Sequence, residues 1–214
     1  MSLDQESFTI FLDTIQKFVD NKLIPREEEV SETNNIPIDV INEMRELGLF
    51  GISIPQEYGG SNLSMEEEVR LTFELGRAAP AFRSIAGTNI GIGSQAIVMS
   101  GTEEQKLKYL PQFATGALIG SFALTEPDAG SDAMSIKTTA KKIGNKYIIN
   151  GTKRYITNAP IAGVFSVMAR TKPEKKSSSI SCFLIDAHTP GLSIGKPDIK
   201  MGQRGALTAD VIFD

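Results

Sequence analysis

The sequence is poor in the residues that build covalently cross-linked or metal-stabilised folds. Of its 214 residues, only Cys182 is a cysteine and only His188 is a histidine. A single cysteine cannot form an internal disulfide, and one cysteine with one histidine cannot supply a His/Cys-rich metal site. These two scarcities exclude a secreted disulfide scaffold and a zinc module, and we expect no metal.

Long apolar runs and an excess of positive charge are also missing. The longest mainly apolar run, 161–169, contains a glycine and a serine and is far too short to cross a bilayer. Near the start, Asp4 and Glu6 stand where a secretory signal would carry basic residues. The net charge of −4 argues against a dedicated nucleic-acid binder. We therefore expect a cytoplasmic protein with no membrane span and no nucleic-acid partner.

The charge changes sign part of the way along the chain. Residues 1–118 hold nine basic and eighteen acidic residues, whereas residues 119–214 hold thirteen basic and eight acidic ones. Two interpretations stay open. Either opposite charges help two units to dock, or the second half binds an anion such as a phosphate.

In the first half, apolar residues recur at three- and four-residue steps, which is typical of amphipathic helices. Pro25 is expected to end or kink the first of them. Capping-box spacings at Ser64 and Thr102 predict two further helix starts, and the second of these helices is expected to end at Pro111. Residues 81–100 are apolar on most sides and predict one buried helix.

From residue 119 onward the pattern is one of strands and turns. The expected strands are rich in Ile, Val, Phe and Thr, and they lie at 119–125, 136–143, 146–150, 152–157, 163–170, 180–186 and 207–213. Gly144-Asn145 and Asn150-Gly151 each predict a tight hairpin turn. The fold class expected is an N-terminal all-α helical domain at 1–118, followed by an antiparallel β-barrel or sandwich domain at 119–214.

Two segments of the second half carry the residue types of a ligand site. The loop 125–132 is dense in Pro, Gly, Ser and Asp, and its hydroxyls and backbone N–H groups can form a concavity for a pyrophosphate. In 153–158, Tyr155 and Thr157 are two residues apart and share one face of a strand, which suits a ring that is stacked upon and hydrogen-bonded at its edge. Taken alone, each segment is more simply an ordinary turn or strand.

Taken together, these segments resemble the acyl-CoA dehydrogenase family. The run 123–135 is similar to the family signature at Thr125, Glu126, Gly130, Ser131, Asp132 and Ser135. Tyr-Ile-Thr-Asn at 155–158 stands where the family has Trp-Ile-Thr-Asn, so that a smaller aromatic ring replaces the commoner one. Further family-like segments lie at 54–60, 101–106, 150–153, 189–191 and 201–204.

The resemblance implies an FAD-dependent oxidoreductase that converts an acyl-CoA thioester into its trans-2-enoyl-CoA. In the family, a base removes the α-proton while the β-hydrogen leaves as hydride to flavin N5, and an electron-transfer flavoprotein then accepts the electrons. The residues that the resemblance assigns to FAD are Phe122, Leu124, Thr125, Gly130, Ser131, Tyr155, Ile156 and Thr157. Those that it assigns to the acyl-CoA are Ser131, Ser84, Thr88 and Ser177.

The resemblance also implies an incomplete enzyme. Family members run to nearly twice this length, and their third, helical domain supplies the catalytic glutamate and the core of a homotetramer. We therefore expect the first two domains, with the β domain truncated at its C-terminal edge, no catalytic residue, and no activity alone. Glu126 is assigned to the loop scaffold rather than to the base. Two alternatives stay open, namely a non-catalytic flavin- or acyl-CoA-binding module and an oxidase on the same scaffold.

Overall fold

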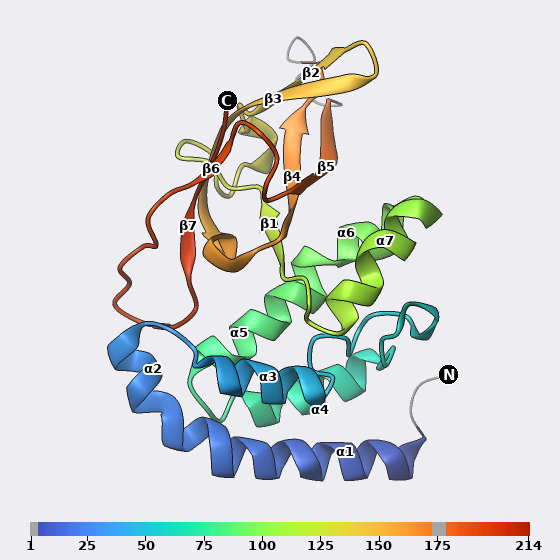
Figure 1. Ribbon diagram of the computed structural model, residues 1–214, viewed down its shortest axis with the longest axis vertical. Helices are drawn as coiled ribbons and strands as arrows, with labels where there is room; N and C mark the ends of the chain where they lie inside the picture. The colour runs from blue at the N-terminus through green and yellow to red at the C-terminus, as the bar shows by residue number, and fades with distance from the viewer. Residues whose placement is uncertain (1–3, 173–178) are drawn as a thin grey trace. The chain divides into compact units, whose positions relative to one another are not determined.

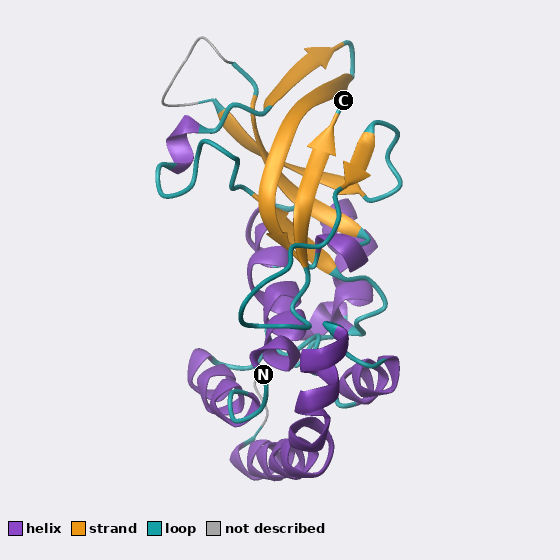
Figure 2. Cartoon of the chain, turned by 90° about the vertical axis from the view of Figure 1, so that its left-hand side faces the viewer, coloured by secondary structure: helices purple, strands orange, loops and turns teal. Residues whose placement is uncertain are grey.

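The computed structural model describes residues 4–172 and 179–214, and it divides the chain into two compact units (Figures 1 and 2). A helical unit comprises the chain up to Leu118 together with Lys200–Ala206. A sheet unit comprises Ile119–Ile199 and Leu207–Asp214. Each unit is described by itself below. No helix in the described part of the chain is long and apolar enough to cross a membrane.

The helical unit is built from amphipathic helices joined by short turns. Its helical segments are α1 (Gln5–Phe18), η1 (Val19–Leu23), η2 (Ile24–Arg26), α2 (Glu27–Thr33), α3 (Ile38–Glu46), η3 (Gln56–Tyr58), α4 (Met65–Leu75), α5 (Pro80–Thr88), η4 (Asn89–Gly93), α6 (Gln95–Ser100) and α7 (Glu103–Ala114). Along α1, the side chains of Phe8, Ile15 and Phe18 are buried and lie at helical spacing, which confirms the apolar stripe. Pro25 lies in η2, where the α-helical pattern is interrupted.

Both predicted capping boxes are formed. The Ser64 hydroxyl accepts from the backbone N–H of Glu67 while the Glu67 carboxylate accepts from that of Ser64, and Thr102 and Gln105 make the same exchange. The helix α7 does not end at Pro111, as predicted, but continues to Ala114. A proline removes only one hydrogen bond of the helical ladder, so a helix held by packing can tolerate it.

The single helix predicted over 81–100 is wrong, because the segment is divided into α5, η4 and α6. The division lies at Gly91, whose backbone (φ −85°, ψ −108°) is not helical. Beside it, the buried amide of Asn89 donates to the carbonyl oxygen of Phe113 at 3.2 Å. A π-helical turn that satisfies a distant carbonyl outweighs the local preference for a continuous helix.

The sheet unit holds a seven-stranded mixed sheet. Its strands are β1 (Gly120–Ala123), β2 (Thr139–Ile143), β3 (Lys146–Thr157), β4 (Val164–Arg170), β5 (Ile180–Asp186), β6 (Leu192–Ile194) and β7 (Thr208–Phe213), with the short helical turns η5 (Ala133–Ser135) and η6 (Ala159–Ile161). The strand order is β1-β4-β2-β3-β7-β6, with β5 pairing β4. Most pairs are antiparallel, but β1 runs parallel to β4, so the sheet is not wholly antiparallel.

The turn at Gly144-Asn145 joins β2 to β3 as predicted, with Gly144 in the left-handed region (φ 62°) (Figure 1). The second predicted hairpin, at Asn150-Gly151, is wrong, since β3 runs through it without a turn. Gly151 serves packing instead, because a Cβ at this position would lie 2.4 Å from the Oγ1 atom of Thr138. The strand β6 was not predicted.

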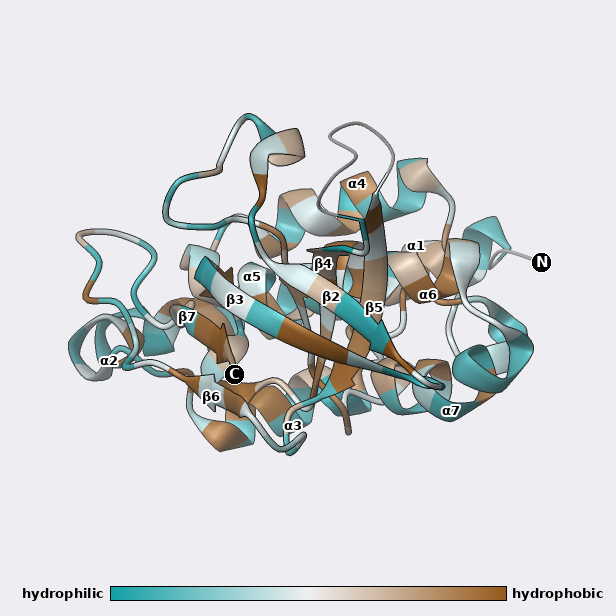
Figure 3. Cartoon of the chain, turned by 90° about the horizontal axis from the view of Figure 1, so that it is seen from above, coloured by the Kyte–Doolittle hydropathy of each residue, from teal (hydrophilic) through white to brown (hydrophobic). Residues whose placement is uncertain are grey.

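The core of the sheet unit lies on one side of the curled sheet. Its buried members include Phe165 and Val167 from β4 and Val211 and Phe213 from β7. In Figure 3 the strand β7 is largely coloured as hydrophobic, and every second residue of this strand is buried. Because successive side chains of a strand point to opposite faces, this alternation leaves Asp210 on the outer face of β7.

Candidate functional site

The two segments that the sequence singles out lie side by side in the sheet unit. The backbone N–H of Arg154 in β3 donates to the carbonyl oxygen of Thr125 at 2.8 Å. Further along, the hydroxyl of Ser121 in β1 donates to the carbonyl oxygen of Thr157 at 2.6 Å. The structure therefore brings Thr125 and Thr157 onto neighbouring segments, although they are 32 positions apart in the sequence. Both side chains are half-buried.

A buried ion pair fixes the segment that begins at Thr125. The ammonium of Lys153 lies 2.8 Å from the carboxylate of Glu126 and 3.1 Å from the carbonyl oxygen of Leu124. The same carboxylate accepts from the backbone N–H groups of Lys137 at 2.5 Å and Thr138 at 2.9 Å. One carboxylate thus joins both ends of the loop to β3.

The surroundings of this pair set the protonation of Glu126. Burial raises the pKa of the carboxyl group, but the hydrogen bonds from Lys137, Lys153 and Thr138 outweigh burial and hold the pKa below its ordinary value. Burial lowers the pKa of Lys153, and Glu126 opposes that effect. A carboxylate with three donors and a lowered pKa is a poor proton acceptor, which agrees with the assignment of Glu126 to the scaffold.

The strand β3 is bulged at the second segment. Its register with β7 shifts between Lys153 and Ile156, and Tyr155 within the shift adopts a left-handed backbone (φ 57°). The left-handed region is rare for an aromatic residue and costs about 1–2 kcal/mol. Lys153 and Ile156 are both buried, whereas the Tyr155 side chain is 61% exposed. The bulge therefore presents an aromatic ring on the surface at the cost of backbone strain.

The guanidinium of Arg154 lies beside this ring, 4.6 Å from its centroid. Its Nη1 atom is 2.7 Å from both carboxylate oxygens of Asp210 in β7, and its Nη2 atom is 3.6 Å from Asp198. The hydrogen bonds to Asp210 are the main reason that the pKa of Arg154 is raised above its ordinary value.

The loop after Thr125 is anchored at its far end by Arg170 of β4. The buried guanidinium of Arg170 donates to the carbonyl oxygens of Ile136, at 2.7 Å, and Met134. Between the anchors, Gly130 and Ser131 are exposed, and a Cβ at Gly130 would meet no atom within 4 Å. A loop with fixed ends and an exposed middle is suited to present its hydroxyl and N–H groups to a ligand.

The remaining predicted residues fall into three groups. Phe122 and Leu124 are half-buried beside Thr125, whereas the Ile156 side chain belongs to the core, so Ile156 can serve a ligand only through its backbone. Ser84, buried, and Thr88, half-buried, lie one turn apart on α5 of the helical unit. Ser177 lies outside the residues that the structure describes.

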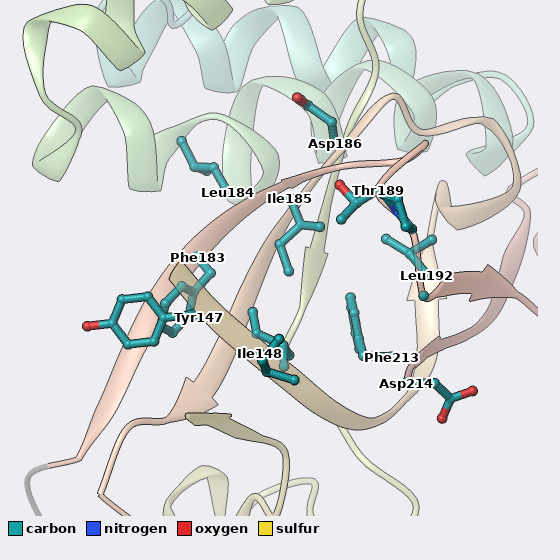
Figure 4. Close-up of a pocket in the computed structure, with 13 residues that line it drawn as sticks. Tyr147, Ile148, Phe183, Leu184, Ile185, Asp186, Thr189, Leu192, Phe213 and Asp214 are labelled. Atoms are coloured by element: carbon teal, nitrogen blue, oxygen red, sulfur yellow. The ribbon is translucent and has the colours of Figure 1, made fainter. Parts of the chain in front are cut away.

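A separate hollow of about 330 Å³ opens beside the core of the sheet unit. Figure 4 shows Tyr147 and Phe183 next to each other at one side of it and Leu192 and Phe213 at the other. The two aromatic rings meet edge to face at 5.0 Å. None of the residues predicted to bind a ligand lines this hollow. In the described ranges no group of three or more His, Cys, Asp or Glu residues is placed to hold a metal ion.

Sequence reasoning missed the supporting residues Lys153, Arg154 and Asp210. A signal for Lys153 was present, because strand alternation places it on the same face as Ile149, which is partly buried and packs against the core, and a lysine buried on that face needs an anionic partner. No local pattern identifies that partner as Glu126, which is 27 positions away. Asp210 offers no signal either, since an acidic residue on an outward strand position is ordinary.

Comparison with known proteins matches both parts of the chain to one family. Residues 5–117 match the family model described as acyl-CoA dehydrogenase, N-terminal domain, and residues 121–214 match that of the middle domain. An acyl-CoA dehydrogenase of Bacillus subtilis is 37% identical over 200 residues, which are 94% of this chain and 53% of the relative. The acryloyl-CoA reductase (NADH) of Anaerotignum propionicum is 42% identical over 201 residues, which are 93% and 51% of the two chains.

Among solved structures, that of an acyl-CoA dehydrogenase from Bacillus anthracis complexed with FAD matches with a TM-score of 0.87 at 33% identity. The match covers 100% of this chain and 37% of that one. The chain spans about half the length of the curated relatives that it matches.

Proposed function

Because this chain belongs to the acyl-CoA dehydrogenase family, we propose that its sheet unit binds the FAD of a flavoprotein dehydrogenase whose substrate is an acyl-CoA thioester. The observation that carries the proposal is the pairing of the Thr125 segment with the Tyr155–Thr157 segment, through the 2.8 Å hydrogen bond between Arg154 and Thr125. This pairing places two threonines and an exposed aromatic ring on adjoining segments.

The chemistry of these groups fits a flavin dinucleotide. An aromatic ring supplies a stacking surface, and threonine hydroxyls can donate to or accept from the edge of a heterocycle. The exposed Gly130–Ser131 stretch offers backbone N–H groups to a phosphate without a Cβ in the way at Gly130. When bound, the flavin would accept the hydride that leaves the acyl chain.

Each residue then has a stated task. Thr125 binds the pyrimidine edge of the flavin, Thr157 donates near N5, and Tyr155 packs against the ring. The flavin ring is also lined by Phe122, Leu124 and the backbone of Ile156. Ser131 binds the pyrophosphate of FAD, and its surroundings contact the acyl-CoA. Ser84, Thr88 and Ser177 are assigned to the acyl-CoA by the resemblance alone.

We further propose that this chain binds FAD but does not turn over. The base that removes the α-proton belongs to the third domain of the family, and Glu126 is already engaged by three donors. In the full enzyme, four copies assemble and an electron-transfer flavoprotein accepts the electrons; family resemblance supports both assignments. The cytoplasmic location is a proposal from the sequence.

The 42% identity to an acryloyl-CoA reductase favours a second candidate, in which the enzyme reduces an enoyl-CoA. The same flavin-binding residues serve either direction.

An FAD titration tests the proposal. Quenching of flavin fluorescence on addition of the chain gives the Kd, and we expect Thr125→Val and Thr157→Val each to weaken binding by about two- to tenfold, as for a lost hydrogen bond. Thr189→Val, on an exposed turn outside the site, is the matched control. Equal Kd values for all four proteins would refute the assignment.

Turnover is tested separately. The chain is incubated with FAD, an acyl-CoA and a dye acceptor, and in a second assay with an enoyl-CoA and a reductant. We expect no turnover in either assay, and robust turnover would contradict the absence of a base.

A further inference from the structure

The backbone at Tyr155 is held in a strained conformation by its neighbours rather than by its own preference. Lys153 and Ile156 on either side are buried, and the N–H of Arg154 is bonded to the carbonyl oxygen of Thr125. These contacts fix where the Cα atom of Tyr155 lies. They do not fix the ring, which is 61% exposed and therefore needs a separate contact to hold one orientation.

Arg154 supplies that contact. Its guanidinium lies 4.6 Å from the ring centroid, within the range of a cation–π interaction. Asp210 fixes the guanidinium through two 2.7 Å contacts from Nη1. Asp198, which lies 3.6 Å from Nη2, is itself held by the hydroxyl of Thr208 at 3.0 Å. The ring, the guanidinium and the two carboxylates thus form one network of side-chain contacts.

The charges of this side-chain network argue against a phosphate-binding role for Arg154. Two carboxylates lie within 4 Å of a single guanidinium, so the local charge is not positive. An anionic ligand would be repelled by Asp210 and Asp198 at least as strongly as Arg154 attracts it. A guanidinium whose charge is already compensated is suited to fixing a neighbouring ring.

We propose that Arg154, held by Asp210, is a positioning residue that stacks on Tyr155 and keeps the exposed ring in the orientation in which it meets the flavin. The role toward the flavin rests on the proposed function. The stacking itself does not, because it is a property of the chain without a ligand.

The absence of tryptophan from the chain makes the stacking measurable. Tyr155→Trp introduces a single indole at the position of the ring. In this background, Arg154→Met removes the guanidinium, and Arg154→Lys keeps the charge without the planar group. Lys142→Met is the control, because it removes an exposed ammonium 6.0 Å from another ring of the same unit, that of Tyr147, outside the site. The readouts are indole anisotropy and acrylamide quenching without FAD. Far-UV circular dichroism checks that each variant is folded.

We expect Arg154→Met to lower the ratio of stacked to unstacked ring about two- to fivefold, with lower anisotropy and stronger quenching. Asp210→Asn should change both in the same direction, Arg154→Lys should restore part of the loss, and Lys142→Met should change neither. In the chain that keeps Tyr155, Arg154→Met should weaken FAD binding about two- to fivefold. Lys142→Met should leave the Kd unchanged.

Two results would overturn the proposal. If Arg154→Met leaves the indole unmoved, Arg154 does not position the ring, and a weaker FAD Kd in that case would indicate direct phosphate contact. If the indole loosens while the Kd is unchanged, the stacking does not serve the flavin. Failure of the proposed function can be told apart from failure of this proposal, since in that case neither the unaltered chain nor any variant would bind FAD.

Discussion

Removing one partner of the buried Lys153–Glu126 pair should destabilise the sheet unit severely. The two side chains are 0% and 5% exposed, so either substitution leaves a charge with little access to water. Lys153→Met also leaves the carbonyl oxygen of Leu124 without this donor. Breaking a buried pair in this way costs about 3–5 kcal/mol. That is a large part of the 5–15 kcal/mol that typically stabilises a domain.

The double variant Glu126→Gln/Lys153→Met separates the charge effect from the loss of packing. It leaves neither charge buried, so its free energy of unfolding should fall by less than the sum of the two single losses, with a coupling of about 2 kcal/mol or more. Urea titrations followed by far-UV circular dichroism, and by an indole introduced with Tyr155→Trp, measure the sheet unit. Lys137→Met, which breaks an ion pair that is 73% and 69% exposed, is the control and should change little. Single losses below about 1 kcal/mol, or strictly additive ones, would show that the pair does not hold the loop.

The same pair makes a prediction for acid pH. The pKa of Glu126 is lower in the folded chain than its ordinary value, so its contribution to stability is complete above that value and is lost as the pH falls through the lowered pKa. The stability difference between the unaltered chain and Glu126→Gln should therefore be largest near pH 7 and should shrink below about pH 4. A difference that stays constant from pH 7 to pH 3 would contradict the lowered pKa.

Two further predictions concern single backbone positions. Gly60→Ala should lower the free energy of unfolding by about 3 kcal/mol or more, because the new Cβ would lie 1.9 Å from the carbonyl oxygen of Ile54. Gly48→Ala is the control, since Gly48 disfavours a side chain only through its left-handed backbone (φ 72°) and an added Cβ would have no atom within 4 Å. This substitution should cost only about 1 kcal/mol. Equal losses for the two variants in urea titrations would refute the steric argument. Tyr155→Gly should leave stability unchanged or raise it by up to about 1 kcal/mol through relief of strain, while weakening FAD binding about tenfold. A marked loss of stability would show instead that the exposed ring supports the fold.

Local signals predicted those parts of the fold whose partners are close in sequence. The capping boxes at Ser64 and Thr102 were predictable because each unites residues three positions apart. The segment Lys200–Ala206 was not predictable as part of the helical unit. Its Gly205 N–H donates to the side chain of Asn34 at 2.9 Å, across 171 positions. Nothing near either residue in the sequence records that contact.

In the candidate site, too, some residues could be predicted from the sequence and others could not. Thr125 and Thr157 could be named from the sequence because their segments match a family pattern, whereas the residues that hold those segments together could not. The strain at Tyr155 is a similar case. A left-handed aromatic residue violates local preference and is tolerated only because buried neighbours and a hydrogen bond to Thr125 fix the backbone.

The carboxylates of the site loop explain why flavin binding and turnover should be separable in this chain. A general base needs a lone pair that is free to accept the proton of the substrate. Glu126 is engaged by three donors, Asp128 pairs with Lys137 at 2.7 Å, and Asp132 accepts from the hydroxyl of Ser135. All three acidic groups of the loop therefore shape or support it. A loop organised in this way can hold a cofactor without a base of its own, and the base must come from residues outside it.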